Sequence, residues 1–275
     1  MLSLKLGTRM AGQRGLHPAR RVIAFDVDKA EAAYGWRSGA AVCIEVPDVA
    51  VFRARRDATV VTAAPNADAD SSVILDSFFD TALPFAVQAT RDVEVMHGSA
   101  VIVAPGGMVA AFCGPTEVGK STVAYGLALR GHGLWADDSV AFEAADGLLR
   151  SFALPFSPKL REASSSHFGV AGDREAFPSF EGRSAPLGWV FLLEPVDAGA
   201  AGAAICERLP PAAALAALLP NAFRFRPAGT ERRRQTLARY LELVASVPVW
   251  EIRYRRDINR LPELLDLLEE RMLLG

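Results

Sequence analysis

Near its middle, the sequence reads Gly114-Pro115-Thr116-Glu117-Val118-Gly119-Lys120-Ser121-Thr122. These residues match the pattern G-x-x-x-x-G-K-[ST] at every fixed position. In such a loop the backbone N–H groups surround phosphates, the lysine reaches the outer phosphates and the Ser/Thr hydroxyl binds Mg²⁺. We therefore predict that all nine residues bind a nucleotide, that Lys120 also serves catalysis, and that Ser121 is a metal ligand.

The residues on both sides are those expected around a phosphate-binding loop. Residues 108–113 form a short apolar run typical of a buried strand, and residues 121–130 carry small and apolar side chains at helical spacing. Gly131 and Gly133 predict the end of that helix. A strand, a loop and a helix N-terminus then follow in the order that favours a bound anion. This order disfavours the alternative, a chance glycine-rich turn.

The composition is that of a globular protein with a sizeable core. The chain has 275 residues, of which 51% are hydrophobic, and its formal net charge of −2 predicts no general attraction to nucleic acid or to an anionic membrane. Three widely spaced cysteines suggest neither a disulfide framework nor a zinc site. We find no secretory signal in residues 1–15, and the apolar run 212–219 is too short to span a bilayer. We therefore expect a cytoplasmic protein that binds no membrane.

The sequence predicts an α/β fold with two domains, residues 1–92 and 93–275. The first domain shows strand-like runs at 21–26, 40–46 and 58–62, and helical spacing from residue 72. Pro84 should kink or restart this helix. The apolar face of the helix indicates packing against the next domain rather than a docking surface. Its residues are Ile74, Leu75, Phe78, Phe79, Ala82 and Leu83.

The second domain alternates strand-like and helical patterns. We expect residues 205–209 to be the hairpin partner of 187–193. Residues 154–186 contain four prolines and three consecutive serines without periodicity, which is typical of a functional loop that becomes ordered when ligand binds. The other predicted strands are 97–103, 134–136, 140–143, 148–152 and 249–254. The later predicted helices are 231–244 and 261–272. The apolar face of the first of these helices consists of Leu237, Tyr240, Leu241 and Val244.

Two adjacent acids, Asp137 and Asp138, lie 17 and 18 residues beyond Lys120. After a three-turn helix and a short strand, this spacing returns the chain to the loop that it left. One carboxylate can hold Mg²⁺, and the other can take the proton of an attacking hydroxyl. The alternative is an acidic turn without a catalytic role.

Three segments together resemble the catalytic core of HPr kinase/phosphorylase and its relatives. They are His97-Gly98-Ser99-Ala100-Val101, the phosphate loop, and the run from Arg130-Gly131-His132 to Asp137-Asp138. The resemblance covers about residues 97–143. It implies a P-loop nucleotide-binding core of the HPr kinase/PEP-carboxykinase-like type with a mixed sheet. The small N-terminal α+β domain is predicted from the patterns of residues 1–92 alone, which the resemblance does not cover.

The same resemblance implies roles for individual residues. Asp138 would be the general base, Asp137 would bind Mg²⁺ with Ser121, and His97 would be an active-site partner near the acids. The alternative for His97 is a histidine at a strand start that bonds only to backbone. The relatives include lasso-peptide tailoring kinases, which phosphorylate a serine of a precursor peptide. The Glu-Arg-Gly signature of the family does not occur in residues 154–186, so the resemblance does not extend to phosphorylase activity or to HPr as the substrate.

The sequence thus predicts a kinase that uses ATP and Mg²⁺ to phosphorylate a serine hydroxyl of a protein or peptide. Two alternatives remain open. One is a nucleotide-gated binding module without phosphate transfer, and the other is a small-molecule kinase with the same site. The oligomeric state is also open, a homo-oligomer included.

Overall fold

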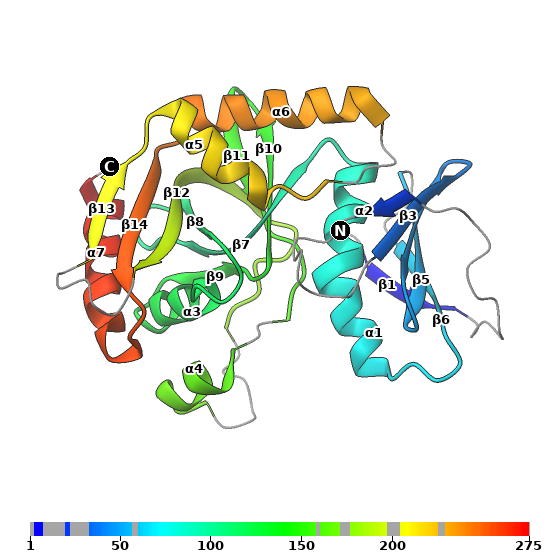
Figure 1. The fold of residues 1–275 in the computed structure, drawn as a ribbon, viewed down its shortest axis with the longest axis horizontal. Coiled ribbons are helices and arrows are strands. Elements are labelled where there is room, and N and C mark those ends of the chain that lie inside the picture. The colour runs from blue at the N-terminus through cyan, green and yellow to red at the C-terminus, as the bar shows by residue number, and fades with distance from the viewer. Residues whose placement is uncertain are drawn as a thin grey trace. The chain divides into compact units, whose positions relative to one another are not determined.

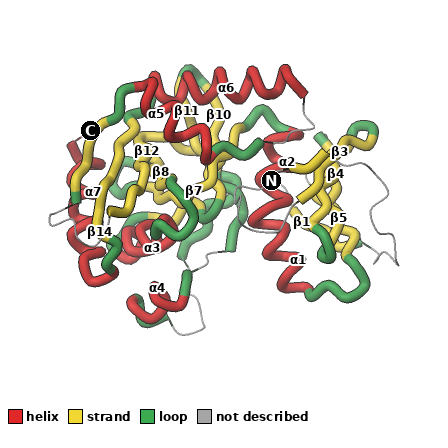
Figure 2. The backbone as a smooth tube through the Cα atoms, viewed as in Figure 1, coloured by secondary structure: helices red, strands yellow, loops and turns green. Residues whose placement is uncertain are grey.

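The computed structural model describes residues 3–7, 20–22, 33–56, 60–157, 160–170, 177–196, 204–224 and 229–274. The chain divides into two compact units. The first consists of Met1–Val95 and Ala222–Ala238, and the second of Met96–Asn221 and Arg239–Gly275. The domains 1–92 and 93–275 stay a prediction, because compactness does not test independent folding. Figures 1 and 2 show the elements of both units.

The first unit contains a six-stranded sheet in the order β1-β6-β5-β4-β3-β2. Only the β1–β6 pair is parallel. The predicted strand 40–46 is confirmed as β4, whereas residues 23–26 and 58–59 of two other predicted strands lie outside the described residues. The strands are β1 Ser3–Leu6, β2 Arg20–Val22, β3 Ala33–Ser38, β4 Ala41–Val46, β5 Ala50–Arg55 and β6 Val60–Pro65.

A helical segment follows this sheet as α1 Ser71–Ser77, a π-helical turn η1 Phe78–Ala82, and α2 Leu83–Thr90. Pro84 lies in the first turn of α2, directly after the π-helical turn, so the predicted restart of the helix at this proline is confirmed. The ring centroids of Phe78 and Phe52 on β5 are 6.1 Å apart, so this part of the apolar face packs on the unit's own sheet. Packing of the face against the next domain stays a prediction. Leu75, expected on the buried face, is exposed.

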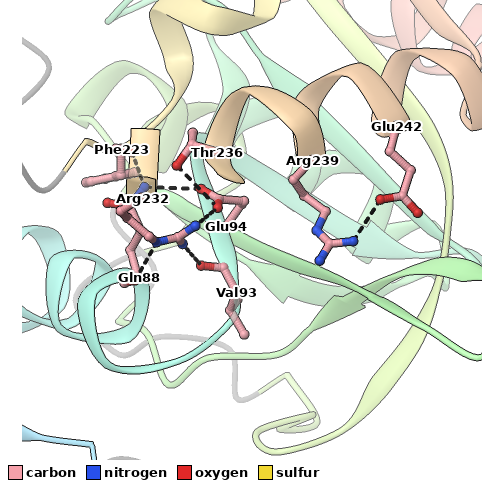
Figure 3. Close-up of polar contacts among 8 residues, drawn as sticks. All are labelled: Gln88, Val93, Glu94, Phe223, Arg232, Thr236, Arg239 and Glu242. Carbon is pink, nitrogen blue, oxygen red and sulfur yellow. Dashed lines mark hydrogen bonds and ion pairs between the residues drawn. The ribbon is translucent and has the colours of Figure 1, made fainter. Parts of the chain in front are cut away.

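The first unit also contains a buried ion pair, drawn in Figure 3. The carboxylate of Glu94 accepts hydrogen bonds from Arg232 and from Thr236 (3.3 Å), and Gln88 Nε2 donates to its other oxygen at 3.2 Å. Arg232 also donates to the carbonyl of Val93 at 2.9 Å. Burial raises the pKa of the Glu94 carboxyl, and Arg232, Gln88 and Thr236 oppose that shift. Together these contacts connect the end of α2, the start of β7 and the first half of α6.

Replacing Glu94 with glutamine is expected to lower the free energy of unfolding by about 3 kcal/mol, because a largely buried guanidinium loses its counter-charge. Urea unfolding measures this change. The control is Glu242→Gln, which breaks the more exposed pair between Arg239 and Glu242 at 2.7 Å (Figure 3) and should cost less than about 1 kcal/mol. Equal losses in both variants would contradict a special role for the buried pair.

The second unit is built on an eight-stranded mixed sheet in the order β11-β10-β7-β8-β12-β14-β13, with β9 paired to β7. Strand β11 also pairs with β12, so five of the strands close a ring. The predicted strands of this unit are confirmed. The bounds are β7 Glu94–Ile102, β8 Val109–Cys113, β9 Gly133–Ala136, β10 Ser139–Ala145, β11 Leu148–Phe152, β12 Ser184–Val196, β13 Ile205–Arg208 and β14 Val249–Arg255.

The expected pairing of residues 205–209 with 187–193 is wrong. Strand β13 pairs with β14, while β12 lies between β8 and β14 and is parallel to both. Both edges of β12 are therefore occupied over this stretch, and a hairpin partner has no free edge to join. Figure 1 shows β8, β12 and β14 as neighbours with β13 outside them.

Helices α3 and α7 pack together against β8, β12 and β14 and share one apolar core with them (Figure 1). The helices predicted at 121–130, 231–244 and 261–272 are confirmed, but Leu237 and Leu241 are exposed rather than buried. Neither α4 nor α5 was expected. The bounds are α3 Lys120–Leu129, α4 Glu162–His167, α5 Pro211–Leu218, η2 Leu219–Asn221, α6 Gly229–Ser246, η4 Ile258–Arg260 and α7 Leu261–Leu274. Within the described ranges, no helix combines the length and apolarity needed to cross a membrane.

Candidate functional site

Residues 114–122 connect the buried end of β8 to the first residues of α3. Gly114 has φ 140°, and a Cβ there would lie 2.7 Å from the carbonyl oxygen of Leu193. Gly119 caps α3 with φ 95°. Only glycine adopts these backbone conformations without strain or collision. The two fixed glycines of the motif are therefore required by the shape of the loop.

Lys120 is the first residue of α3, and its side chain folds back across the loop. Its ammonium donates to the carbonyl oxygens of Gly114 at 3.0 Å and Pro115 at 2.8 Å. The side chain is buried at 6% exposure. A lysine ammonium is a compact point charge of the kind that proteins use to bind phosphate.

Two residues that the motif does not include hold this loop in place. The Oδ1 of Asn221 accepts a hydrogen bond from the backbone N–H of Gly114 at 3.3 Å, and the Tyr254 hydroxyl donates to the carbonyl of Val118. Burial raises the pKa of Tyr254 to about 12, so this hydroxyl remains a donor at neutral pH. Asn221 carries no recognisable sequence signal, and Tyr254 was recognised only as part of a strand.

Asp137 lies directly after β9 and joins three segments of the site. Its Oδ1 accepts hydrogen bonds from the hydroxyls of Ser121 and Ser99, each at 2.7 Å. Asp137 and Ser99 are both buried. The spacing argument therefore correctly predicted that Asp137 lies beside the loop. The contact of Ser99 on β7 with Asp137 was not predicted, although Ser99 lies in the 97–101 segment.

Asp138 occupies a left-handed backbone conformation with φ 61° and is partly exposed. Its carbonyl accepts hydrogen bonds from the Gly98 N–H at 3.3 Å and from His97 Nδ1 at 3.1 Å. Because a carbonyl only accepts, Nδ1 of His97 carries the proton in this contact. His97 is thus beside the acid pair, through a contact with backbone. Both readings of this histidine are compatible with that geometry.

Arg130 and His132, at the start of the run that ends in the two acids, contact helix α7 instead of the loop. Arg130 forms ion pairs with Asp266 at 2.7 Å and Glu269 at 2.6 Å, and His132 Nε2 lies 3.2 Å from the Glu269 carboxylate. These contacts attach the end of α3 to α7. The two residues therefore serve the packing of the unit.

The segment at α4 contacts the loop and the helix that follows it. Arg161 forms an ion pair with Glu117 at 2.6 Å, and the hydroxyls of Thr122 and Ser164 are 2.8 Å apart. The ring centroids of Tyr125 and Phe168 are 5.0 Å apart. Part of the stretch expected to be a loop without secondary structure is therefore a short helix packed on α3.

The hydroxyl of Ser121 and the carboxylate of Asp137 suit a magnesium ion. Mg²⁺ prefers oxygen ligands and is usually bound by one or two carboxylates together with substrate phosphates and water. Among the described residues, no group of three or more His, Cys, Asp or Glu side chains could hold a metal ion.

No family model and no curated protein matches this sequence. Among solved structures, the chain is similar to the HPr(Ser) kinase/phosphatase from Coxiella burnetii, with 13% sequence identity and a TM-score of 0.32. The match covers 66% of this chain and 93% of that one. The fold and the site themselves define a mixed α/β protein with a phosphate-loop motif beside two acids.

Proposed function

We propose that this chain is a kinase that uses ATP and Mg²⁺ to phosphorylate a serine hydroxyl of a protein or peptide. The observation that carries the proposal is the hydrogen bond from Ser121 to Asp137, which joins the last part of the phosphate-loop motif to an acid pair. A protein that only binds a nucleotide needs an acid for the metal but no second acid. Asp138 is such a second acid, and it lies at a partly exposed position where a substrate hydroxyl can reach it.

Each residue of the site has a role in this proposal. The backbone N–H groups of residues 114–122 bind the phosphates, and Lys120 exchanges its two carbonyl partners for phosphate oxygens. Ser121 and Asp137 would hold Mg²⁺, which would supply positive charge to the nucleotide phosphates. His97 holds the backbone of Asp138 in its left-handed turn through the contact with its carbonyl.

The transfer step then follows from the position of Asp138. Its carboxylate takes the proton from the serine hydroxyl as the serine oxygen bonds to the γ-phosphorus. The bond from that phosphorus to the β,γ-bridging oxygen breaks, and ADP leaves.

We propose further that residues 93–275 form a P-loop catalytic domain of the HPr kinase/PEP-carboxykinase-like type and that residues 1–92 form a small α+β domain. We also propose that a ribosomal precursor peptide is one class of acceptor.

The test is transfer of γ-labelled phosphate from Mg-ATP by the wild-type chain to serine-containing peptides and proteins. We expect phosphoserine in the acceptor and ADP in equal amount. Labelling of a small hydroxyl compound alone would favour a small-molecule kinase. Tight nucleotide binding with no transfer to any acceptor would favour a nucleotide-gated binding module.

Replacing Asp137 with asparagine is expected to raise the Mg²⁺ concentration needed for half-maximal activity by about tenfold to a hundredfold. An amide oxygen keeps the hydrogen bond from Ser121 or Ser99 but lacks the charge that attracts the cation. Initial rates against free Mg²⁺ measure this shift. An unchanged Mg²⁺ requirement in the variant would show that Asp137 is not a ligand of the metal.

A further inference from the structure

The 114–122 loop carries a carboxylate of its own, and a residue outside the motif neutralises it. Glu117 has φ 70°, in the middle of the loop. Its Oε1 lies 2.6 Å from Nη1 of Arg161, which precedes α4. Both side chains are about half exposed, at 48% for Glu117 and 59% for Arg161. The pair is therefore accessible to a ligand bound at the loop.

A carboxylate in this position opposes the binding of a polyphosphate, because like charges at short range raise the energy of the bound state. An arginine that pairs with the carboxylate cancels most of this repulsion. The loop's own Lys120 lies on the Gly114 and Pro115 side, where it bonds to their carbonyls. The carboxylate of Glu117 pairs with Arg161.

Two further contacts keep Arg161 in reach of the loop. The Ser164 hydroxyl is 2.8 Å from that of Thr122, and the Phe168 ring packs 5.0 Å from that of Tyr125. Both partners are on α3: Thr122 is the last residue of the 114–122 loop, and Tyr125 follows three residues later. Residues 161–168 thus contact the loop and its helix through an ion pair, a hydrogen bond and an aromatic contact.

We propose that Arg161 is a positioning residue of the nucleotide site, which neutralises Glu117 and so makes residues 161–168 part of the phosphate-binding surface. The ligand class is a nucleoside triphosphate or another polyphosphate. This inference rests on the proposed function. It adds a determinant of affinity that the phosphate-loop motif does not contain.

Calorimetric titration with Mg-ATP tests the charge compensation directly. Arg161→Ala should weaken binding about fivefold, and Glu117→Gln should leave it equal or up to about fivefold tighter. The double variant carries the wild-type net charge at the loop and should bind within about twofold of wild type. Arg239→Ala removes an arginine from another ion pair of the same unit and should bind as wild type does. A salt titration should shrink the loss in Arg161→Ala.

The outcomes separate this inference from the proposed function. If the wild type binds no Mg-ATP, both are wrong. If the wild type binds and Arg161→Ala binds equally well, only the inference is wrong. A double variant as weak as Arg161→Ala would also overturn it, because the arginine would then act by some means other than neutralising Glu117. A Glu117→Arg, Arg161→Glu exchange that binds better than Arg161→Glu alone would support it independently of packing.

Discussion

Replacing Asp138 with asparagine is expected to slow phosphate transfer about 10²–10⁴-fold while Mg-ATP still binds with nearly wild-type affinity. Asparagine keeps the volume of the side chain and tolerates the left-handed conformation that Asp138 adopts at φ 61°. The contacts of the Asp138 carbonyl with Gly98 and His97 involve backbone oxygen and survive the change. What is lost is the group that accepts the serine proton. Calorimetry and a transfer assay on the same preparation separate binding from chemistry.

A matched control for this variant lies in the next turn of the sheet. Asp146 also adopts a left-handed conformation, with φ 54°, and is exposed between β10 and β11. Asp146→Asn makes the same chemical change at a similar backbone conformation and should transfer phosphate at the wild-type rate. If Asp138→Asn did the same while binding nucleotide normally, Asp138 would not be the general base.

The order of elements in the second unit could be predicted because its signals are local. The apolar run of β8, the glycines after α3 and the turn between β10 and β11 each depend on neighbouring residues, and the structure confirms all three. The partner of β13 could not be predicted, because strand pairing over a long separation has no local signature. Alternation of apolar and polar residues shows that a segment is a strand, but does not show which edge it joins.

Burial was harder to predict than helix position. Leu237 and Leu241 have the spacing of a buried stripe on α6, yet they are exposed, while Tyr240 and Leu243 are buried. Periodicity fixes which residues share a helix face, whereas the neighbouring elements decide how wide the covered face is. For the same reason Leu75 lies outside the contact that buries Phe78 on α1–η1.

The candidate site divides in the same way between local and distant signals. The sequence led to Lys120, Ser121 and Asp137, because a motif fixes the first two and a short strand returns the chain to the third. It did not lead to Asn221, which lies 107 residues after Gly114 and reaches the loop through the packing of distant elements. Such contacts depend on the packing of whole elements, so one sequence without its fold does not reveal them.

Replacing Lys120 with alanine is expected to weaken Mg-ATP binding about 100-fold and to abolish measurable transfer. A hydrogen bond between charged groups contributes about 1.5–3 kcal/mol, and the ammonium would make such bonds to the outer phosphates. The wild-type side chain donates to two carbonyls of its own loop, those of Gly114 and Pro115. The change removes no side chain from the apolar core that α3 shares with α7 and the sheet, so the variant should keep a cooperative thermal transition. Isothermal titration and phosphate transfer measure the two effects.

Two further variants make this result specific to the phosphate loop. Lys120→Met keeps the aliphatic stem that is buried in the wild type but removes the charge, and it should lose affinity as alanine does. Lys5→Ala removes an exposed lysine from β1 and should change neither binding nor transfer. Because the methionine variant preserves packing, a loss seen in Lys120→Ala but absent in Lys120→Met would assign the effect to collapse of the loop. ATP turnover equal to wild type in all three variants, with acceptor present, would rule out residues 114–122 as the phosphate-binding loop.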